Sequence, residues 1–512
     1  MNAFRTDERL LAPAASAPPA SGPLALVVGS GFGGLAAAIR LSVMGYRVQV
    51  LEKNEAPGGR ACAFSQDGFV FDAGPTIITA PFLLEELWAL CGRRFADDVT
   101  LVPMDPYYRV RFDDGTHFDY NGDPEHMRRE VARFSPDDVA GYERFMDEAE
   151  LCKRLGFEGM GAVAFDRFGD LLKAIPDFLR MGAWRSIHAR VSRHIRNEKL
   201  RTVLSFHPLL IGGNPFSVTA AYALINALER TWGVHSALGG TGAIVRGMVD
   251  LLAERGVPVR CNTPVRRIRI EGGRAVGVEL EGGEQIDAAL VVSNGDTAWT
   301  YRHLVDPAHR KVWTDRKIEG GRYSMGLFVW YFGTSRRYED VPHHMLVLGP
   351  RYKGLLHDIF KRHHLSDDFS LYLHRPTATD PSVAPPGCDT FYALSPVPHL
   401  DSGTDWAQEA PRYQARIAQA LEDSVLPGLR EHLVTSHIRT PQTFHDRLWS
   451  YKGAGFGLEP LLTQSAWFRP HNRSEDIPGL YMVGAGTHPG AGVPGVLMSA
   501  KALQTVIPAV HG

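Results

Sequence analysis

The sequence predicts an α/β protein with two lobes, one of which is assembled from separate stretches of the chain. Its length, 512 residues, exceeds what a single hydrophobic core usually supports. An apolar run followed by glycines and an alanine-rich stretch opens the readable part of the chain, and a similar glycine-rich pattern lies near its end. We therefore expect the two ends to meet in one nucleotide-binding lobe, with the intervening residues forming a second lobe.

Composition is that of an ordinary globular enzyme and excludes several other classes. Hydrophobic residues make up 44% and charged residues 22% of the chain, which is usual for such enzymes. The formal net charge of −2 gives no case for a nucleic-acid partner. The five cysteines lie far apart without a CxxC pair, so we expect no structural zinc or other metal, no disulfide framework, and a reducing cytoplasm as the compartment.

The N-terminal residues 1–23 predict a disordered tail. They are rich in proline and alanine, carry mixed charge and lack the uninterrupted apolar core of a signal peptide. Nowhere in the chain is an uninterrupted apolar run long enough to cross a bilayer. If the protein meets a membrane, we expect it to do so from the surface.

The stretch LVVGSGFGGLAAAIRLSVMGYRVQVLEK, residues 26–53, predicts a strand–turn–helix–strand unit that binds a dinucleotide. Gly29 allows the tight turn, Gly31 lets the backbone approach a pyrophosphate, and Gly34 lets helix and strand pack closely. The helix N-terminus offers free N–H groups to the phosphates, and Glu52 stands where an acid binds ribose hydroxyls. The alternative is a glycine-rich turn without a ligand. The predicted contacts of this unit are Gly29, Ser30, Gly31, Phe32, Gly33, Gly34, Glu52 and Lys53.

The segment after Glu52 favours FAD over NAD. APGGRACAF supplies a second glycine turn followed by Arg60, and FVFDAGPTIIT follows it. This order is typical of flavoproteins in which FAD lies extended across the domain. Arg60 would contact the pyrophosphate or hold the loop, although a surface salt bridge of little energetic value is the alternative. Gly59, Arg60, Pro75 and Thr76 are the predicted contacts here.

The C-terminal stretch GLYMVGAGTHPGAGVPGVLMSAKALQTVI, residues 479–507, predicts another strand, a glycine-rich turn and a helix near the flavin ring. A closing turn without a ligand is the alternative. The predicted contacts are Gly486, Val493 and Pro494. Residues 239–294 supply a further helix and strands, in which the backbone of Val265 is a candidate partner for adenine.

These pieces predict a discontinuous, Rossmann-like FAD-binding lobe over residues 24–100, 239–298 and 440–512. The insertions 101–238 and 299–439 would form an α+β lobe that binds the substrate. The first insertion is helical in pattern, and within residues 171–200 Leu, Met, Trp184 and Ile187 alternate with arginines. Such a basic amphipathic stretch either packs as ordinary core or rests on an anionic membrane surface.

Several motifs together resemble the bacterial-type phytoene desaturases, a carotenoid desaturase family within the amine-oxidase-like FAD flavoproteins. The resembling stretches span about residues 26–507 and include VVGSGFGGLAAAIRL, PGGRA, FDAGPTIIT, SFHPLLIGGNPF, ALERTWGV and HPGAGVPGV. The first motif is shared by many flavoproteins, whereas SFHPLLIGGNPF and HPGAGVPGV are much narrower. Many flavoproteins have a Gly-Asp pair after the final strand, but here the chain reads Gly484-Ala485-Gly486-Thr487, as in the carotenoid subgroup.

The resemblance implies FAD-dependent desaturation of 15-cis-phytoene, through phytofluene and ζ-carotene, to neurosporene or lycopene. It implies a peripheral enzyme that takes phytoene and the later carotenes from the membrane surface. Because no second dinucleotide unit is evident, oxygen or a quinone would reoxidise the flavin. The number of desaturation steps, the electron acceptor and the oligomeric state stay open.

Candidate proton-handling groups follow from the resemblance and from the scarcity of carboxylates in the apolar segments. Asp170 in FGDLLKAIP, with Lys173 one helical turn later, is the predicted catalytic pair, and an exposed ion pair is the alternative. His207 and His488 are further titratable groups near the motifs. On this basis Asp170→Asn should slow desaturation more than it weakens FAD binding.

Other functions on the same scaffold remain open from sequence. One is a carotenoid desaturase or isomerase that acts later in the pathway. Another is an amine oxidase, which would usually cage its flavin with aromatic residues. A third is a non-enzymatic carrier of prenylated proteins, which lacks FAD. PGGR and the glycine-rich C-terminus favour a flavoprotein over the carrier.

Overall fold

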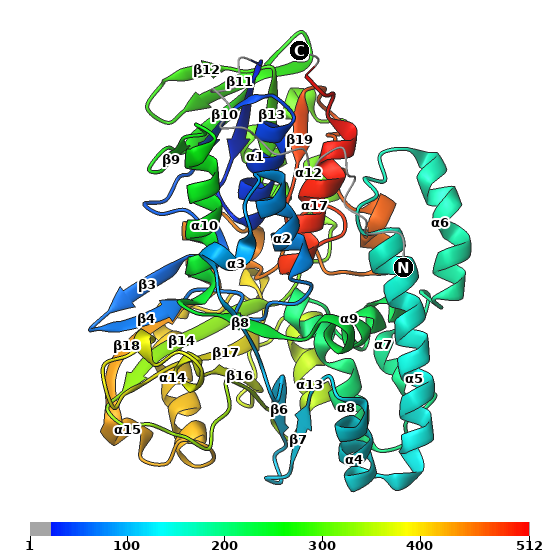
Figure 1. The fold of residues 1–512 in the computed structure, drawn as a ribbon, viewed down its shortest axis with the longest axis vertical. Helices are drawn as coiled ribbons and strands as arrows, with labels where there is room; N and C mark the ends of the chain where they lie inside the picture. Colours follow the sequence, from blue (N-terminus) through cyan, green and yellow to red (C-terminus); the bar gives the residue numbers. More distant parts are fainter. Residues whose placement is uncertain (1–21, 511–512) are drawn as a thin grey trace.

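The computed structural model describes residues 22–510, so most of the predicted disordered tail, residues 1–21, lies outside the described residues (Figure 1). A parallel five-stranded sheet forms the upper lobe of Figure 1, in the order β19-β13-β1-β2-β9. Its strands come from distant parts of the sequence, and this arrangement confirms the predicted α/β class. They are β1 (Leu24–Val28), β2 (Arg47–Leu51), β9 (Val259–Arg260), β13 (Leu290–Ser293) and β19 (Leu480–Met482).

Helices pack on one face of this sheet through apolar residues that form one large core cluster. The first is alanine-rich and buries almost its whole length, so it can lie close to the strands and to the last helix of the chain. An antiparallel three-stranded sheet, β10-β11-β12, contributes to the core at the other face. These elements are α1 (Phe32–Val43), α2 (Phe82–Leu90), α10 (Gly240–Glu254), α17 (Val493–Val506), β10 (Val265–Glu271), β11 (Arg274–Leu280) and β12 (Gln285–Asp287).

Residues just beyond the predicted boundary at 298 also belong to this part of the core. Tyr301, Trp313, Ile318 and Tyr323 pack in the same apolar cluster as Leu26 of β1. The nucleotide-binding core therefore takes in side chains that the sequence assigned to the second lobe. The domain division at 100, 239, 298 and 440 otherwise stays a prediction.

Gly34 shows why one glycine of the first motif is needed for packing. A Cβ atom at this position would lie 2.1 Å from the carbonyl oxygen of Gly29, so strand and helix could not approach as they do. We expect Gly34→Ala to destabilise the protein by about 1–3 kcal/mol, the usual cost of overpacking a core. Gly169→Ala, in open space on another helix, is the control and should change thermal unfolding little. Equal melting temperatures for the two variants would contradict this account.

A mixed seven-stranded sheet forms the second lobe, in the order β18-β14-β17-β16-β15-β6-β7. Strand β14, which lies between the edge strand β18 and β17, is buried along its whole length. Leu327, Val329 and Tyr331 point to one side, while Phe328 and Trp330 pack against the cluster beneath helix α14 (Trp406–Glu422) on the other. The strands are β6 (Tyr108–Arg111), β7 (His117–Tyr120), β14 (Gly326–Thr334), β15 (His344–Val347), β16 (Leu371–His374), β17 (Asp389–Val397) and β18 (Leu433–Arg439).

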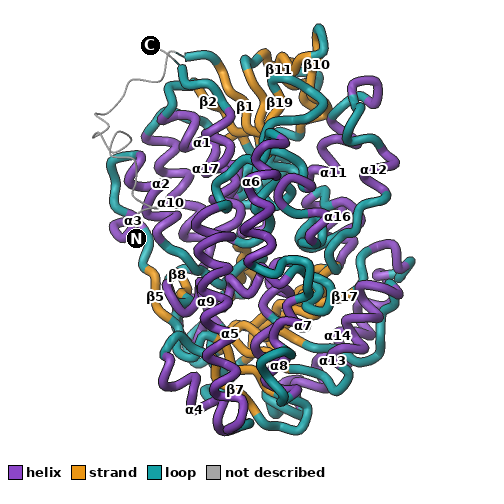
Figure 2. The backbone as a smooth tube through the Cα atoms, turned by 90° about the vertical axis from the view of Figure 1, so that its right-hand side faces the viewer, coloured by secondary structure: helices purple, strands orange, loops and turns teal. Residues whose placement is uncertain are grey.

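A group of helices flanks this sheet and forms the right-hand side of Figure 1. Helix α6 lies at the outer edge of the molecule in Figure 1 and in front of its neighbours in Figure 2. The chain after Ser135 forms a short 3₁₀ turn, Pro136–Asp138, and continues as α5. The helices are α4 (Pro124–Phe134), α5 (Val139–Cys152), α6 (Phe168–Arg180), α7 (Ile187–Val191), α8 (Glu198–Ser205) and α9 (Leu224–Trp232).

Short elements complete the described chain. Within residues 22–510, no helix is both long and apolar enough to cross a bilayer. The remaining strands are β3 (Ala63–Gln66), β4 (Phe69–Asp72), β5 (Leu101–Pro103) and β8 (His235–Ala237). The remaining α-helices are α3 (Phe95–Asp98), α11 (Thr297–Trp299), α12 (Asp315–Glu319), α13 (Tyr352–His357), α15 (Leu429–His432) and α16 (Pro441–Leu448).

Candidate active site

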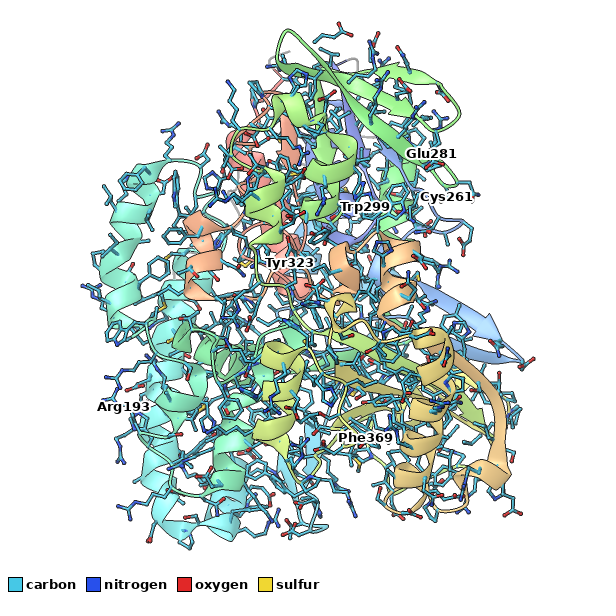
Figure 3. All side chains as sticks on the ribbon, turned by 180° about the vertical axis from the view of Figure 1, so that it is seen from behind. Arg193, Cys261, Glu281, Trp299, Tyr323 and Phe369 are labelled. Carbon is cyan, nitrogen blue, oxygen red and sulfur yellow. The ribbon has the colours of Figure 1, made fainter. Side chains whose placement is uncertain are left out.

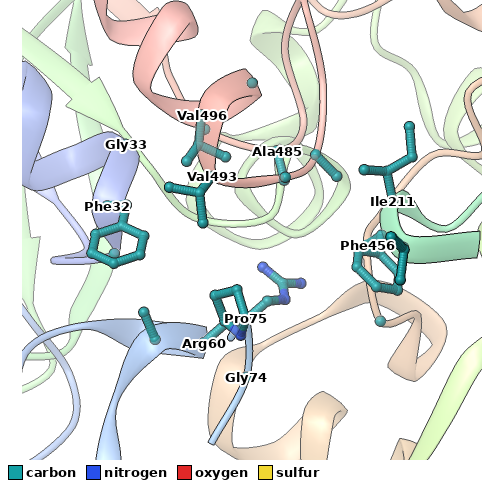
Figure 4. A pocket seen from close by; sticks show the side chains of 18 of the residues that line it. Phe32, Gly33, Arg60, Gly74, Pro75, Ile211, Phe456, Ala485, Val493 and Val496 are labelled. Atoms are coloured by element: carbon teal, nitrogen blue, oxygen red, sulfur yellow. The ribbon is translucent and has the colours of Figure 1, made fainter. Parts of the chain in front are cut away.

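One cavity, with a volume of about 520 Å³, connects the two lobes. Its walls include the glycine-rich turns at both ends of the chain and the inward side of the seven-stranded sheet. Figure 4 shows Phe32 and Gly33 on one side of the open space, Val493 and Ala485 above it, Pro75 and Arg60 below it, and Ile211 and Phe456 opposite Phe32. The two ends of the chain therefore build one site, as the sequence predicted.

Most of the predicted cofactor contacts line this cavity. They are Gly29, Ser30, Gly31, Phe32, Gly33, Glu52, Lys53, Gly59, Arg60, Pro75, Thr76, Val265, Val493 and Pro494.

Two predicted contacts do not line the cavity. Gly34 faces the backbone of Gly29 and serves helix–strand packing alone. Gly486 packs against Thr297, where a Cβ atom would lie 2.4 Å from the threonine Cγ2. The C-terminal turn meets the cavity instead through Gly484, Ala485 and Gly492. The sequence pattern identified the turn but not which of its glycines faces inward.

The helices that follow the two glycine turns both present an uncapped N-terminus to the cavity. The N-cap of α1 is Gly31 and that of α17 is Gly492, and neither has a side chain that accepts from the first turn. Free N–H groups and the helix dipole at such ends favour anionic groups. The residues present thus fit FAD, with a pyrophosphate at α1 and the more distal part of the cofactor toward α17.

Glu52, at the end of β2, is buried and already holds the turn between β1 and α1. Its Oε2 accepts from the backbone N–H of Ser30 at 2.9 Å and from the Ser30 hydroxyl at 2.6 Å. Its Oε1 accepts from the N–H and the side-chain amide of Asn54, both at 3.0 Å. These four hydrogen bonds occupy the roughly four acceptor sites of the carboxylate, so a ribose hydroxyl would replace one of them, such as the bond from the rotatable Ser30 hydroxyl.

Glu52→Ala should weaken FAD binding at least tenfold. A hydrogen bond to a charged acceptor contributes about 1.5–3 kcal/mol, and the substitution also releases Ser30 next to the pyrophosphate site. Titration of the apoprotein with FAD measures the effect. Glu55→Ala is the control, because Glu55 is exposed and pairs only with Arg447 at the surface. An unchanged FAD dissociation constant in folded Glu52→Ala protein would refute the ribose assignment.

Arg60 is held inside the site and is not part of a surface ion pair. Its Nη2 donates to the hydroxyl of Ser450 at 2.5 Å, and its buried Nε has no protein partner among the described residues. Burial lowers the pKa of Arg60, while the nearby carboxylate of Asp296 opposes that shift. An unsatisfied, buried guanidinium nitrogen beside the cavity fits an anionic or carbonyl group of the cofactor.

The part of the cavity beyond the glycine turns is lined mainly by apolar side chains. Strand β14 lines it through alternate residues and the 3₁₀ segment η5 (His207–Ile211) through consecutive ones. Other walls come from α6, α9, β16 and β17. Lining residues include Phe206, Leu209, Leu210, Ile211, Ile225, Leu228, Met325, Leu327, Val329, Leu346, Leu371 and Leu394. Such a chamber suits a long hydrocarbon without a charged group.

The structure does not bring the predicted Asp170–Lys173 pair to this cavity. Both residues lie on α6, and Asp170 lines only a separate shallow pocket with Arg167 and Arg473. Lys173 is exposed, and no hydrogen bond or ion pair joins the two side chains. Asp170 stands near the start of α6, eight positions and about 12 Å along the helix axis before Phe178, which lines the apolar wall. The geometry therefore gives no support to the idea that this pair touches substrate.

The two histidines singled out by the sequence occupy different environments. His488 lines the cavity, and its Nε2 lies 2.8 Å from the carbonyl of Met160, so it ties the C-terminal turn to the helical region. Burial lowers the pKa of His488 to about 4, and the imidazole is therefore neutral at pH 7. His207 is fully buried beside Glu229.

Glu229 is the residue that sequence reasoning missed. It lines the cavity from α9 with 1% of its surface exposed. The signal was its spacing, since Ile225, Leu228 and Glu229 are separated by three and four positions and so share one helix face. The motif ALERTWGV could therefore have shown, from sequence alone, that a glutamate lies on an otherwise apolar helix face.

Comparison with known proteins assigns the chain to a family. The sequence profile described as flavin containing amine oxidoreductase matches residues 32–502. A phytoene desaturase (neurosporene-forming) of Cereibacter sphaeroides is 49% identical over 496 residues, which cover 96% of each protein. A phytoene desaturase (lycopene-forming) of Pantoea ananas is 46% identical and covers 93% of this chain and 97% of its own. The chain belongs to the phytoene desaturases of the flavin containing amine oxidoreductase family.

Solved structures agree in fold. An oxidoreductase from Methanosarcina mazei has a TM-score of 0.65 at 18% identity and covers 94% of this chain and 100% of its own. Putrescine oxidase bound to putrescine has a TM-score of 0.64 at 15% identity, with 94% and 98% covered. Family membership makes the chain an FAD-dependent oxidoreductase, so the predicted fold class and cofactor are confirmed and the non-enzymatic carrier is set aside.

Proposed function

We propose that this enzyme desaturates 15-cis-phytoene, through phytofluene and ζ-carotene, to neurosporene, lycopene or both. The observation that carries the proposal is the single cavity that joins the dinucleotide cradle to an apolar chamber. The names of the relatives at 46–49% identity support the same substrate. A hydrocarbon substrate offers no charge to bind, so affinity must come from apolar area removed from water.

The chain's own residues would bind the polyene and exclude water from it. Bound FAD supplies a hydride acceptor, and this step is cofactor chemistry. The inward side chains of β14, β17 and η5 would hold an allylic carbon near the turns that bind the flavin. We further propose that oxygen or a quinone takes the electrons from the reduced enzyme.

The product is decided by experiment, because relatives named neurosporene-forming and lycopene-forming are 49% and 48% identical to this chain. Purified holoenzyme incubated with phytoene in liposomes should yield phytofluene and ζ-carotene first, and neurosporene or lycopene later, by chromatography. Conversion of ζ-carotene alone, with phytoene untouched, would favour a later-acting desaturase. Isomerised phytoene without new double bonds would favour an isomerase.

We also propose that the enzyme docks on the membrane surface through α6. Large apolar side chains recur along one face of this helix at intervals of three and four residues, and they are exposed to solvent. They are Phe168 (58% exposed), Leu172 (53%), Ile175 (42%) and Leu179 (59%), with Trp184 (60%) just after the helix. Exposed apolar faces of this extent mark interaction surfaces. We call these five residues the α6 face.

The position of α6 relative to the cavity supports this docking. Phe178 of the same helix and Met181 at its C-cap point inward and line the cavity. A lipid surface in contact with Leu179 would therefore lie beside the apolar chamber, so phytoene could pass from bilayer to enzyme with little exposure to water.

The docking surface differs in detail from the stretch predicted within residues 171–200. Ile187 and Arg190 are buried, so neither can contact lipid. Arg180, Arg185 and Arg193 are exposed near the α6 face and can meet anionic headgroups. Figure 3 shows Arg193 on the outer flank of the helical region. The proposed surface uses only part of the predicted segment, because the sequence alone does not reveal which of its side chains pack inward.

A further inference from the structure

Glu229 is a carboxylate buried in the wall of a hydrocarbon-binding chamber. Its Oε1 accepts a hydrogen bond from the hydroxyl of Tyr108 at 2.7 Å. Its Oε2 lies 3.1 Å from Nε2 of His207, yet neither atom has a hydrogen bond with any described residue. Both side chains are at most 1% exposed. A carboxylate that lines a cavity and keeps one buried oxygen outside any hydrogen bond calls for an explanation beyond packing.

If the side chain at position 229 served only to bind the hydrocarbon substrate, a carboxylate would be an unfavourable choice in these surroundings. Ile225 and Leu228 flank it on α9, and Phe206 and Leu346 line the cavity nearby. An uncharged side chain at position 229 would bind a polyene better, because burial of a polar group without full hydrogen bonding is costly. The cost is consistent with a chemical task for the group.

Three carboxylate side chains line the cavity within residues 22–510, and two of them are committed to the cofactor-binding turns. Glu52 holds Ser30 and Asn54. Asp296 caps α11 by accepting from the N–H of Trp299 and lies near Arg60. Glu229 belongs to the apolar chamber instead and keeps one oxygen free of hydrogen bonds.

The nearby imidazoles are poorer proton acceptors. Burial lowers the pKa of His488 to about 4 and that of His344 well below its usual range. The Nδ1 atom of His344 is also hydrogen-bonded to the hydroxyl of Tyr372 at 2.6 Å. Tyr108 cannot compete either, because burial and the charge of Glu229 raise its pKa well above 10, so it stays a donor to Glu229.

We propose that Glu229 is the catalytic base of the desaturation, an inference that rests on the proposed function. In each step one allylic C–H bond breaks with its electron pair, and this hydride passes to the oxidised flavin. The neighbouring C–H bond then gives up its proton to Oε2 of Glu229, and its electron pair becomes the new C=C bond. The substrate loses two hydrogens and two electrons, the flavin is reduced, and the proton is held on Glu229.

Tyr108 and His207 act as positioning residues in this arrangement. The Tyr108 hydroxyl fixes Oε1 and leaves Oε2 directed away from it. His207, stacked on Phe206 with ring centroids 4.1 Å apart, lies with its Nε2 3.1 Å from Oε2 and so restricts the position of that oxygen. Neither needs to touch the substrate for this role.

The test is the rate of flavin reduction by phytoene without oxygen, in holoenzyme on liposomes. Glu229→Gln should slow reduction by about 100-fold or more, the usual contribution of a general base, while FAD content and phytoene binding stay near wild type. Glu229→Asp should recover most of the rate. The rate of flavin reduction in Tyr108→Phe should lie between the rates of the two Glu229 variants, and its affinity for phytoene should equal that of the wild type. Glu279→Gln, a buried carboxylate on β11 paired with Arg266 and Arg267, is the control and should match wild type.

The outcomes separate the inference from the proposed function. If phytoene reduces the flavin at the same rate in Glu229→Gln as in the wild type, the role of Glu229 is overturned and the proposed desaturase activity stands. A wild-type flavin that phytoene never reduces would overturn both. A third outcome is that FAD and phytoene binding are both lost in Glu229→Gln, Glu229→Asp and Tyr108→Phe. This outcome would show that the cluster is structural, and it would also overturn the inference.

Discussion

Changing Leu172, Ile175 and Leu179 together to serine should release the enzyme from anionic vesicles. About half of each side chain is exposed in the free protein. Transfer of this apolar surface from water into lipid therefore contributes roughly 1 kcal/mol per residue to the free energy of binding. Loss of all three corresponds to a fall in vesicle affinity of about a hundredfold. Flotation with liposomes measures binding, and phytoene turnover on liposomes should fall in parallel.

A matched control is available in apolar residues exposed elsewhere. Val312 and Val434 are 38% and 51% exposed on other elements, and their replacement by serine should leave flotation unchanged. Neutral vesicles or high salt should weaken wild-type binding, because each basic residue near an anionic surface contributes about 1 kcal/mol. Full flotation of the triple variant would exclude α6 as the docking element. Equal binding to neutral and anionic vesicles would exclude the contribution of the arginines.

Gly492→Val should give a folded protein that no longer retains FAD. Gly492 has a φ of +97°, where a β-branched residue is strongly disfavoured, and its Cβ atom would lie 3.2 Å from Cγ2 of Ile211. The valine would also fill space at the uncapped N-terminus of α17, where the cavity is open. We expect FAD affinity to fall more than a hundredfold, since backbone displacement and blocked space act on the same site.

Gly403→Val separates backbone strain from the effect on the cavity. Gly403 also has a positive φ, +69°, but a Cβ atom there meets nothing within 4 Å. This control should lose some thermal stability and keep its flavin. Visible absorbance of the purified proteins and FAD titration give the answer. Retention of the flavin by Gly492→Val would show that the C-terminal turn does not contact the cofactor.

The sequence predicted the cofactor lobe well because its signals are local. Gly29, Gly31 and Glu52 occupy fixed positions in one short strand–helix–strand unit, and that unit has one common way to fold. Arg60 and Pro75 follow closely enough to share the site. Gly486 was misplaced because five glycines lie within a dozen residues, and only the backbone path decides which of them faces inward.

The substrate side depended on tertiary packing that one sequence does not reveal. Asp170 and Glu229 are both acids on amphipathic helices, and only the packing of each helix in the fold places Glu229 in the chamber and Asp170 outside it. Tyr108 and Glu229 lie 121 positions apart, so their hydrogen bond was not predictable from spacing. Residues 299–323 pack under the parallel sheet for the same reason, although they follow the predicted boundary.

The central claim is that one cavity brings FAD and phytoene together, and anaerobic mixing tests it most directly. Purified yellow holoenzyme is mixed without oxygen with liposomes that contain phytoene, and flavin absorbance is followed in time. We predict loss of the oxidised flavin spectrum together with one equivalent of phytofluene per flavin, and recovery of the spectrum when an acceptor is added. A flavin that stays oxidised over saturating phytoene, in protein that floats with the liposomes, would contradict the account.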